Sequence, residues 1–508
     1  MKSLITWIKQ NKLECLILTT ILGVAAFLRF YRLPDYMTFL GDEGRDALIV
    51  KDILVNHIIP SIGPPSSVGN IYLGPLYYYM MAVPMGIFWL NPVAATAMVA
   101  LIGVMAVALI YYLARVWFGV CAAILAASLY ALSFVTITYS RSSWNPNPVP
   151  FFTLLAILGF YKARQSKNFL WLILTGISLA AAVQMHYLSL ILLPIFGLLW
   201  VFELKDQVIR QKYSHFIFGT ISAITVFILM LMPLILFDFR HNFLNYRGIV
   251  SLFTQSDSSV GFNIFTSLGK ILPIFNDKLI GRYLGAENII VTLFISILVI
   301  VPLIYGLYKS FRQSKGDNSW SVFALGIWLI VGLFGISLFK LEIYDHYLGF
   351  ISPVPFLLLG GFVGIFKNKI GLIITIIIIF IVGFLNLQKT TILQPANYQL
   401  ERTQQISKYI IQEVGNKQFN FALLSENNYD SAYQYFLDLY GNKPRVVPVD
   451  ITDQLYVVCE DKVCKPVGNA KYEIAGFGWT LIEKEEIVSG VKVFKLVHNP
   501  AQKNEKSL

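Results

Sequence analysis

Residues 370–388 read IGLIITIIIIFIVGFLNLQ, a run of 19 residues without one charged side chain. A helix needs about 20 mostly apolar residues to cross the hydrocarbon core of a bilayer, so this run predicts a membrane span. Charged residues make up only 14% of the 508 residues and apolar residues 56%, which excludes a chain built of soluble domains alone. Ten other segments meet the same standard, near 13–30, 93–113, 118–139, 148–162, 169–185, 187–202, 215–237, 288–308, 319–339 and 348–366. The sequence therefore predicts a polytopic α-helical membrane protein with about 11 transmembrane helices and further interfacial helices on the outer side.

The net charge of +11 is concentrated in the short loops on one side of these spans. With the N-terminus inside, the cytoplasmic segments hold 15 basic and 4 acidic residues, whereas the short outer turns hold only Arg141 and Lys340 as basic residues. Lys and Arg collect in the cytoplasmic loops of membrane proteins, so the charge is a topology signal and gives no reason to expect nucleic acid as a partner. An odd number of spans places the C-terminus outside. The prediction is a protein integral to the plasma (inner) membrane, with an extracytoplasmic C-terminal part.

Two segments need a separate interpretation under this topology. A full span at 72–90 would invert every later loop, so this aromatic segment is predicted to lie in the outer interface or to dip in and return. The first span follows Lys2, Lys9 and Lys12 and is not followed by a small-residue cleavage site. We therefore predict a retained helix there and not a signal peptide.

The tail from 389 to 508 differs from the rest of the chain, because it holds 14 basic and 14 acidic residues. Helical patterning at 401–415 and 429–440, with alternating runs at 419–424, 454–459 and 491–497, predicts a small α/β domain on the outer side. Cys459 and Cys464 flank four residues, a spacing that a β-hairpin disulfide could close in an outer compartment. Free thiols are the alternative. A metal site is disfavoured because no second Cys or His pair lies near.

The first outer loop carries an acidic pair followed by an arginine, Asp42-Glu43-Gly-Arg45. A carboxylate there can accept a proton from an attacking hydroxyl, and the arginine can orient a carboxylate or a phosphate. Gly41 and Gly44 are expected to let the backbone turn tightly around the pair. The structural alternative is an ordinary helix N-terminus, where acidic side chains are favoured by the helix dipole.

Further polar segments fall at the outer ends of the predicted spans. No phosphate-binding loop or dinucleotide glycine pattern is present, so a soluble nucleotide donor is not expected. With the acidic pair, these segments resemble the polyprenyl-phosphate-dependent glycosyltransferases of the C-type membrane fold, which include the protein O-mannosyltransferases and the lipid A aminoarabinose transferase. The segments that carry the resemblance are GPLYYY at 74–79, YSRSSWNPNP at 139–148, QMHY at 184–187, FDFRHNF at 237–243 and YDHY at 344–347.

The resemblance implies an inverting sugar transfer from a polyprenyl phosphate to an acceptor hydroxyl. It makes Asp42 the general base, with Glu43 holding the acceptor or tuning the base. A phosphate leaving group needs cations opposite the base. The resemblance matches Arg45 to that role, with Arg240, His241, Arg282 and Arg141 as further candidates for donor phosphate or lipid binding. One departure is that some relatives have Lys-Pro-Pro where this chain has Leu73-Gly74-Pro75, so their lysine is missing.

The remaining candidates for substrate binding each have a structural alternative. Tyr and Trp residues stack on sugars but also form the aromatic belts of membrane interfaces. The Asn-Pro pairs favour turns, and the Asp-x-Arg-His run at 238–241 can pair its own charges. A divalent cation, Mg or Mn, bound by Asp345 and His346 with Asp42 stays open, but too few ligands are visible to argue for it. The candidates are Tyr77, Tyr78, Trp144, Asn145, His186, Asp238 and His346.

The sequence thus predicts two domains. Residues 1–388 are the transmembrane glycosyltransferase domain, with an outer catalytic loop at 31–92 and a second outer loop at 238–287, and 389–508 are the extracytoplasmic α/β domain. The expected partners are the lipid donor, a lipid, glycan or protein acceptor, and the membrane. A lipid-linked sugar flippase is disfavoured because the spans are nearly free of charge at mid-membrane depth. An oligosaccharyltransferase-like enzyme is disfavoured because the tail has no Trp-Trp-Asp motif.

Overall fold

The structure is a computed structural model that describes residues 6, 9–66, 71–209, 213–254, 264–312, 317–366 and 368–499. Its contacts divide the chain into two compact units, each assembled from three segments. The first unit holds Met1–Tyr31, Pro60–Val83 and Ala95–Pro395, and the second holds Arg32–Ile59, Pro84–Ala94 and Ala396–Leu508. Most of the predicted catalytic loop, 32–59 and 84–92, therefore belongs to the same unit as the C-terminal residues. The domain boundary at 388 stays a prediction.

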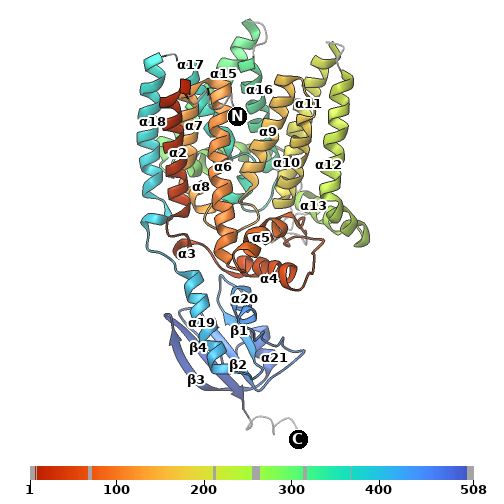
Figure 1. The fold of residues 1–508 in the computed structure, drawn as a ribbon, viewed down its shortest axis with the longest axis vertical. Coiled ribbons are helices and arrows are strands. Elements are labelled where there is room, and N and C mark those ends of the chain that lie inside the picture. Colours follow the sequence, from red (N-terminus) through yellow and green to blue (C-terminus); the bar gives the residue numbers. More distant parts are fainter. Residues whose placement is uncertain are drawn as a thin grey trace. The chain divides into compact units, whose positions relative to one another are not determined.

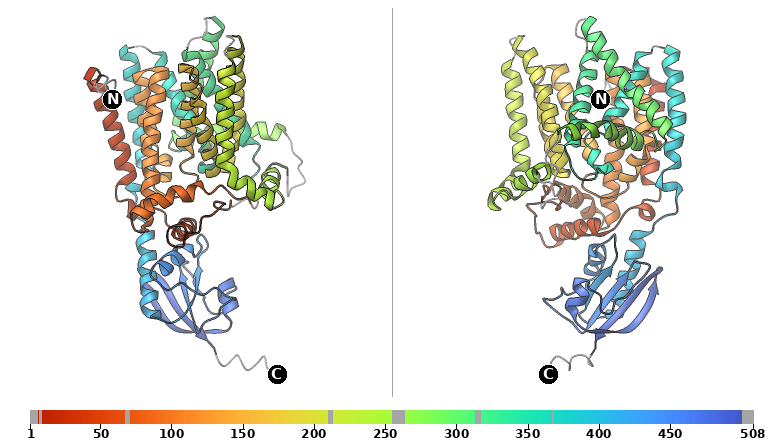
Figure 2. Two further views of the ribbon diagram at one scale, coloured as in Figure 1. Left: turned by 45° about the vertical axis from the view of Figure 1, so that its right-hand side comes forward. Right: turned by 180° about the vertical axis from the view of Figure 1, so that it is seen from behind.

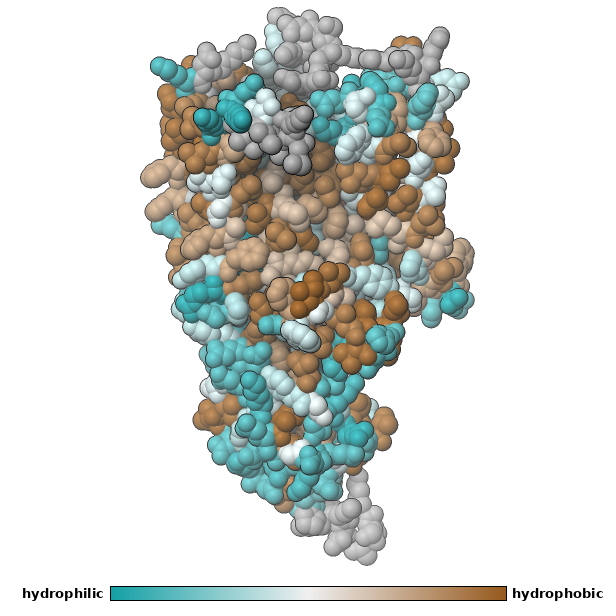
Figure 3. All heavy atoms as spheres, in the orientation of Figure 1, coloured by the Kyte–Doolittle hydropathy of each residue, from teal (hydrophilic) through white to brown (hydrophobic). Residues whose placement is uncertain are grey.

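The first unit is a helical bundle, shown in Figure 1. Its longest helices are apolar along most of their length and give this unit the brown surface in Figure 3. The helices with most of their residues in this unit are α2 (Lys12–Phe30), α5 (Leu76–Ile87), α6 (Pro92–Phe118), α7 (Val120–Leu132), α8 (Phe134–Tyr139), α9 (Val149–Ser166), α10 (Trp171–Met185), η1 (Tyr187–Ile191), α11 (Leu192–Ile209), α12 (Tyr213–Arg240), α13 (Leu244–Thr254), α14 (Ile264–Pro273), η2 (Ile274–Gly281), α15 (Ile289–Arg312), α16 (Asp317–Ser337), η3 (Asp345–Leu348), α17 (Pro353–Ile365), α18 (Asn368–Gln388) and η4 (Thr391–Leu393).

The described residues contain seven helical stretches long and apolar enough to cross a membrane: α2, α6, η1 with α11, α12, α15, α16 and α18. Three shorter apolar helices, α7, α10 and α17, accompany them. Each of the predicted spans overlaps a helix, but the span predicted at 118–139 is broken at Ser133, whose extended backbone separates α7 from α8. The prediction of a polytopic α-helical membrane protein is confirmed, whereas the count of 11 spans is not.

The burial of the spans separates lipid-facing helices from helices of the bundle interior. In the apolar stretch of α12 only 6% is buried inside the protein, whereas in that of α16 the buried share is 56%. Apolar side chains left exposed along a whole helix need an apolar solvent, which the bilayer supplies. The chain is therefore an integral membrane protein.

Two segments that the sequence treated as non-spanning contain helices of their own. α5, within the predicted interfacial segment 72–90, has 12 residues with Pro84 inside it, and it is not among the span-length helices. The segment 238–287 was expected as an outer loop but contains α13, α14 and the π-helix η2. Residues 255–263 of this segment lie outside the described residues.

The second unit is a four-stranded sheet with helices, and its surface is mostly hydrophilic in Figure 3. The strand order is β1-β2-β4-β3, with β1 parallel to β2 and the other pairs antiparallel. Figure 2 shows the twisted sheet from two further directions. Its elements are α3 (Leu33–Tyr36), α4 (Gly41–Val55), α19 (Gln399–Val414), β1 (Asn420–Leu424), α20 (Ser431–Leu439), β2 (Gln454–Cys459), α21 (Tyr472–Phe477), β3 (Thr480–Val488) and β4 (Val491–His498).

Both faces of this sheet are covered, because successive strand residues point to opposite sides. Phe421 and Leu423 of β1 pack with α19 and α20, whereas Ala422 and Leu424 belong to a second cluster with α21. The predicted helices and the three predicted strands of the tail are all present, and β3 is an additional strand at the sheet edge. Cys459 and Cys464 form a disulfide, with their Cα atoms 6.2 Å apart.

Candidate active site

The acidic pair occupies the first turn of α4. The Glu43 carboxylate is buried and accepts a hydrogen bond from the Leu40 backbone N–H at 3.1 Å, which caps the start of the helix. Asp42 is different, because its side chain is 40% exposed. A carboxylate in the first turn is stabilised by the free N–H groups of the helix end. The local sequence thus gives one structural and one accessible carboxylate.

Arg45, one turn further on, joins two carboxylates. Its Nη1 donates to Asp42 Oδ1 at 2.8 Å, and its Nε and Nη2 donate to Asp46 Oδ1 at 2.9 and 2.7 Å. Both pairs bring opposite charges into hydrogen-bond contact, which holds the arginine in one orientation. The positive charge of Arg45, the arginine expected to bind the donor phosphate, is therefore balanced by two carboxylates of its own helix.

Asp46 is the least accessible carboxylate of this helix, with 0% exposure. Its Oδ2 has no hydrogen-bond partner among the described residues. Burial raises the pKa of Asp46 to about 7, while Arg45 opposes the shift and the charges of Asp42 and Glu43 add to it. Asp46 therefore titrates near neutral pH.

This titration predicts a pH dependence of stability. The pKa of Asp46 is raised in the folded chain, to about 7 from 3.8, so the stabilising contribution is complete below pH 4 and is lost as pH rises through 7. Between pH 5 and pH 8 the loss is about 2–3 kcal/mol. We expect Asp46→Asn to remove this loss, so that its melting temperature falls less between the two pH values than that of the unchanged chain. Equal falls in both proteins, measured by circular dichroism, would contradict the assignment.

Tyr429, from the loop between β1 and α20, completes the environment of Asp42. Its hydroxyl donates to Asp42 Oδ1 at 2.5 Å and accepts a hydrogen bond from Arg45 Nη1 at 3.3 Å. Burial and the contact with Asp42 raise the pKa of Tyr429, so the hydroxyl keeps its proton and acts as a donor. Both hydrogen bonds to Asp42 end on Oδ1, and none of the described residues donates to Oδ2.

The two glycines beside the acidic pair have a different role from the one expected. A Cβ on Gly41 would lie 2.4 Å from Cδ1 of the Tyr429 ring, and a Cβ on Gly44 would lie 2.2 Å from the backbone nitrogen of Ala432. Neither glycine has a positive φ. They are therefore needed for the close approach of the C-terminal residues and not for a tight turn of the backbone.

The first unit contains a separate aromatic cluster, built from three of the polar segments noted in the sequence. The His346 ring lies 4.4 Å from the Trp144 ring and 5.8 Å from the His186 ring, measured between centroids. Beside them, Asn145 Nδ2 donates to the Met185 carbonyl at 2.6 Å, and the hydroxyls of Tyr77 and Ser143 lie 2.9 Å apart. The structure thus brings together five of the predicted substrate-binding residues.

Both imidazoles of this cluster are neutral. Burial lowers the pKa of His346 to about 4, and burial together with the neighbouring His346 lowers the pKa of His186 to about 3. His186 Nδ1 accepts the Leu188 backbone N–H at 3.3 Å, which places the His186 proton on Nε2. The cluster is therefore an uncharged aromatic surface, suited to stacking and single hydrogen bonds.

Arg282 is bound by carboxylates on two sides. Its Nε lies 3.1 Å from each carboxylate oxygen of Asp345, and its Nη2 lies 2.6 Å from Oδ2. It also pairs with Glu287, which in turn contacts Lys389. The Asp345 contact raises the pKa of Arg282. The positive charge of Arg282 is therefore balanced by Asp345 and Glu287.

The other predicted residues lie in varied surroundings. Arg141 is 2% exposed and donates to the carbonyls of Leu28, Arg29 and Tyr31, so it caps the end of α2. Tyr78 is also buried. Asp238 accepts the backbone N–H groups of Asn245 and Tyr246 and so caps α13. Arg240 and His241 are exposed, and Arg240 has no ion-pair partner among the described residues.

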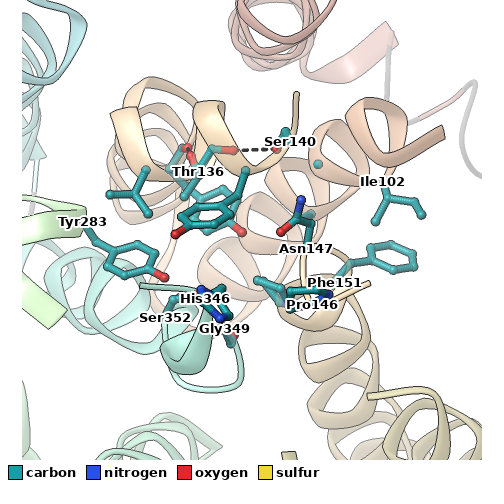
Figure 4. A pocket seen from close by; sticks show the side chains of 16 residues that line it. Ile102, Thr136, Ser140, Pro146, Asn147, Phe151, Tyr283, His346, Gly349 and Ser352 are labelled. Atoms are coloured by element: carbon teal, nitrogen blue, oxygen red, sulfur yellow. Dashed lines mark hydrogen bonds between the residues drawn. The ribbon is translucent and has the colours of Figure 1, made fainter. Parts of the chain in front are cut away.

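A cavity of 40 Å³ adjoins the aromatic cluster (Figure 4). Side chains of Asn147, Tyr283, His346 and Ser352 line it, together with apolar residues of α6 and α9. Its size suits a few water molecules. A sugar would need a larger space, so this cavity alone is not a substrate site.

The described residues do not fit the divalent cation that the sequence left open. No group of three or more His, Cys, Asp or Glu side chains in the described ranges is placed to hold a metal ion. Asp345, a candidate ligand, has both oxygens hydrogen-bonded to Arg282. Asp42 shares Oδ1 between Arg45 and Tyr429. Asp345 therefore has no oxygen without a donor, and Asp42 has only Oδ2.

Sequence reasoning missed three residues of these clusters. No motif assigned a role to Asp46 or to Tyr429, and Asp345 was considered only as a metal ligand. The available signal for Asp46 was its position next to Arg45 in a helix, and for Asp345 it was its position next to His346. Tyr429 is 387 residues away from Asp42, and no local pattern connects the two.

The comparisons with known proteins agree on the kind of fold. Residues 72–244 match the family described as dolichyl-phosphate-mannose-protein mannosyltransferase. ArnT from Cupriavidus metallidurans, crystallised with undecaprenyl phosphate, superposes with a TM-score of 0.60 at 12% identity, over 94% of this chain and 97% of that one. The Archaeoglobus fulgidus oligosaccharyltransferase with Zn and sulfate gives a TM-score of 0.54 at 14% identity, over 87% and 67%. AglB from Archaeoglobus fulgidus, in complex with an inhibitory peptide and a dolichol-phosphate, gives a TM-score of 0.53 at 12% identity, over 89% of this chain and 70% of that one. No curated protein sequence matches the chain.

The fold is that of the C-type membrane glycosyltransferases. The family match of residues 72–244 agrees with the class expected from the sequence, the membrane glycosyltransferases with lipid-phosphate sugar donors. Identities of 12–14% define the fold and leave the roles of individual residues to the geometry.

Proposed function

We propose that this chain transfers a sugar from a polyprenyl-phosphate donor to an acceptor hydroxyl on the outer face of the membrane, with Asp42 as the general base. The observation that carries the proposal is the asymmetry of the Asp42 carboxylate. Oδ1 is held by Arg45 and Tyr429, while Oδ2 receives no donor from the described residues and the side chain is 40% exposed. A base needs one fixed orientation and one accessible oxygen.

The reaction follows from this arrangement. The acceptor oxygen attacks the anomeric carbon as its proton moves to Asp42 Oδ2, and the bond from that carbon to the phosphate oxygen breaks. The electron pair of that bond leaves with the polyprenyl phosphate, and a single displacement inverts the anomeric centre. Glu43 caps α4 and places a second negative charge beside the base, which supports a tuning role over a direct contact with the acceptor.

Arg240 is the best supported ligand for the donor phosphate. It is exposed at the last residue of the span-length helix α12, where a side chain can reach the headgroup level of a bilayer. His241 lies next to it with its ring stacked on Phe237 at 4.0 Å. Arg45, Arg141 and Arg282 remain predictions for this role, and their carboxylate or carbonyl partners would have to exchange for the phosphate.

The outer location rests on the charge asymmetry of the loops. Fifteen basic and four acidic residues fall on one side of the predicted spans, which supports a cytoplasmic N-terminus and an extracytoplasmic C-terminal unit. The disulfide Cys459–Cys464 in the C-terminal unit is of the kind formed in an oxidising compartment. Asp42 belongs to the same compact unit.

The aromatic cluster is the proposed contact for the sugar. Sugar rings stack on aromatic faces, and Trp144 is half-buried against His346. We expect Trp144→Ala to raise the KM for the donor about tenfold, with little change in kcat, since a stacking contact contributes about 1 kcal/mol. Trp144→Phe retains a ring and is expected to keep most of the affinity. Unchanged KM values in both variants would remove Trp144 from the substrate site.

The function is tested with the full chain in vesicles that contain undecaprenyl-phosphate mannose and an acceptor mixture from envelope proteins and lipids. Transfer releases undecaprenyl phosphate and labels an acceptor, and both products can be followed by mass spectrometry. Label that crosses the bilayer without a labelled acceptor would instead indicate a flippase. A donor panel with other lipid-phosphate sugars and a lipid-linked oligosaccharide separates single-sugar transfer from the oligosaccharyltransferase alternative.

A further inference from the structure

We infer that Tyr429 is a positioning residue for the base, so the C-terminal residues complete the reaction centre. The inference rests on the proposed role of Asp42 and extends it to a second segment of the chain. Two donors fix Oδ1 of Asp42, and one of them is the Tyr429 hydroxyl. A carboxylate held at one oxygen cannot rotate away from the acceptor, so the other oxygen stays directed at the reaction.

The position of Tyr429 over α4 is fixed by the residue before it. Asn428 Oδ1 accepts the backbone N–H of Gly41 at 2.9 Å, and Asn428 Nδ2 donates to Glu460 Oε2 at 3.0 Å. The Asn428 side chain therefore ties the first turn of α4 to the residue that follows β2. The absence of a side chain on Gly41 leaves room for the Tyr429 ring directly above this turn.

Further contacts along α20 hold this helix against α4. Ala432 approaches Gly44 so closely that a Cβ there would meet backbone. Further along, Lys51 Nζ pairs with Asp438 Oδ2 at 3.0 Å, with both side chains less than one-fifth exposed. Phe39, just before α4, packs its ring against Tyr435 and Phe436. Tyr429 thus reaches Asp42 from a rigid support.

The chemistry of the hydroxyl fits a positioning role. Tyr429 stays protonated because partial desolvation and the neighbouring carboxylate raise the pKa of its hydroxyl, so it donates to the ionised form of Asp42. When Asp42 takes up a proton, the same hydroxyl can still contact Oδ1, and the geometry of the pair is kept through the reaction. A purely structural C-terminal unit would not need a hydroxyl at this point.

The test compares Tyr429→Phe with Tyr435→Phe in the full chain. Each variant removes one hydroxyl that donates a hydrogen bond within the same unit, since Tyr435 Oη donates to the Leu90 carbonyl. We expect Tyr429→Phe to lower kcat about tenfold, the effect of losing one hydrogen bond to a charged group, with KM for undecaprenyl-phosphate mannose unchanged. Tyr435→Phe is expected to keep the kcat of the unchanged chain.

The outcomes separate the inference from the function on which it rests. A full kcat in Tyr429→Phe overturns the inference, as do equal losses in the two tyrosine variants, which would indicate a structural effect. If Asp42→Asn stays active, the proposed base is wrong, whatever the rate of Tyr429→Phe shows. If Asp42→Asn is inactive and Tyr429→Phe is fully active, only the positioning role falls.

Discussion

Asp42→Asn is expected to lower the rate of sugar transfer about a thousandfold, the usual size of the contribution of a general base. Asparagine keeps the shape of the side chain and an oxygen that can accept from Arg45 and Tyr429, so the fold is expected to persist. It cannot take the proton of an acceptor hydroxyl. The measurement is kcat in vesicles with undecaprenyl-phosphate mannose, together with the affinity for undecaprenyl phosphate, which should not change.

Asp438→Asn provides the matched control. It removes a carboxylate of the same unit, one that pairs with Lys51 and does not contact Asp42. We expect it to keep most of the transfer rate. An active Asp42→Asn would show that Asp42 is not the base. Equal losses in both variants would show that the loss of charge, and not the loss of a base, determines the rate.

Gly44→Ala is expected to destabilise the second unit by about 3 kcal/mol, the upper range for overpacking a close contact. The new Cβ would lie 2.2 Å from the Ala432 backbone nitrogen, so α4 and α20 must separate. The gain in helix propensity, about 1 kcal/mol, is smaller than this cost. The melting temperature of the unit should fall by roughly 6 °C or more. Transfer should fall as well, because Tyr429 moves with α20.

Gly86→Ala is the control for this substitution. Gly86 lies in the same unit, and its Cβ would meet only the Leu54 side chain, at 3.3 Å, which can rotate away. Its melting temperature should change little. If Gly44→Ala is as stable as Gly86→Ala, the two helices are not packed as closely as the structure has them.

The membrane helices could be predicted from the sequence because their signal is local. An apolar run such as that of α18 specifies a span without reference to the rest of the chain. The exact number of spans was less accessible, since Ser133 breaks a run that looks continuous in composition. β3 was missed for a related reason. Its segment Glu483-Lys484-Glu485-Glu486 looks like a solvated loop, but charges are common on an edge strand.

The candidate site was predictable only where its residues adjoin in sequence. Asp42, Glu43 and Arg45 form a recognisable group, and their shared position on α4 follows from the spacing. Their individual roles depend on tertiary contacts. Arg282 meets Asp345 from 63 residues away, and Tyr429 meets Asp42 from 387 residues away, so neither pairing is visible in a local pattern.

The second unit is assembled from three segments of the chain, and this determines which parts of the protein can be exchanged with those of relatives. Residues 32–59 and 84–94 belong to it as much as the C-terminal sheet does. A fragment that begins at residue 396 would lose α4 and Phe39, leaving the surface of α20 that receives them exposed to water. A chimaera with a foreign tail would in the same way lose the partner of Asp42. Three separate stretches of sequence therefore form one structural module, and a change in the tail requires a matching change in the loop after the first helix.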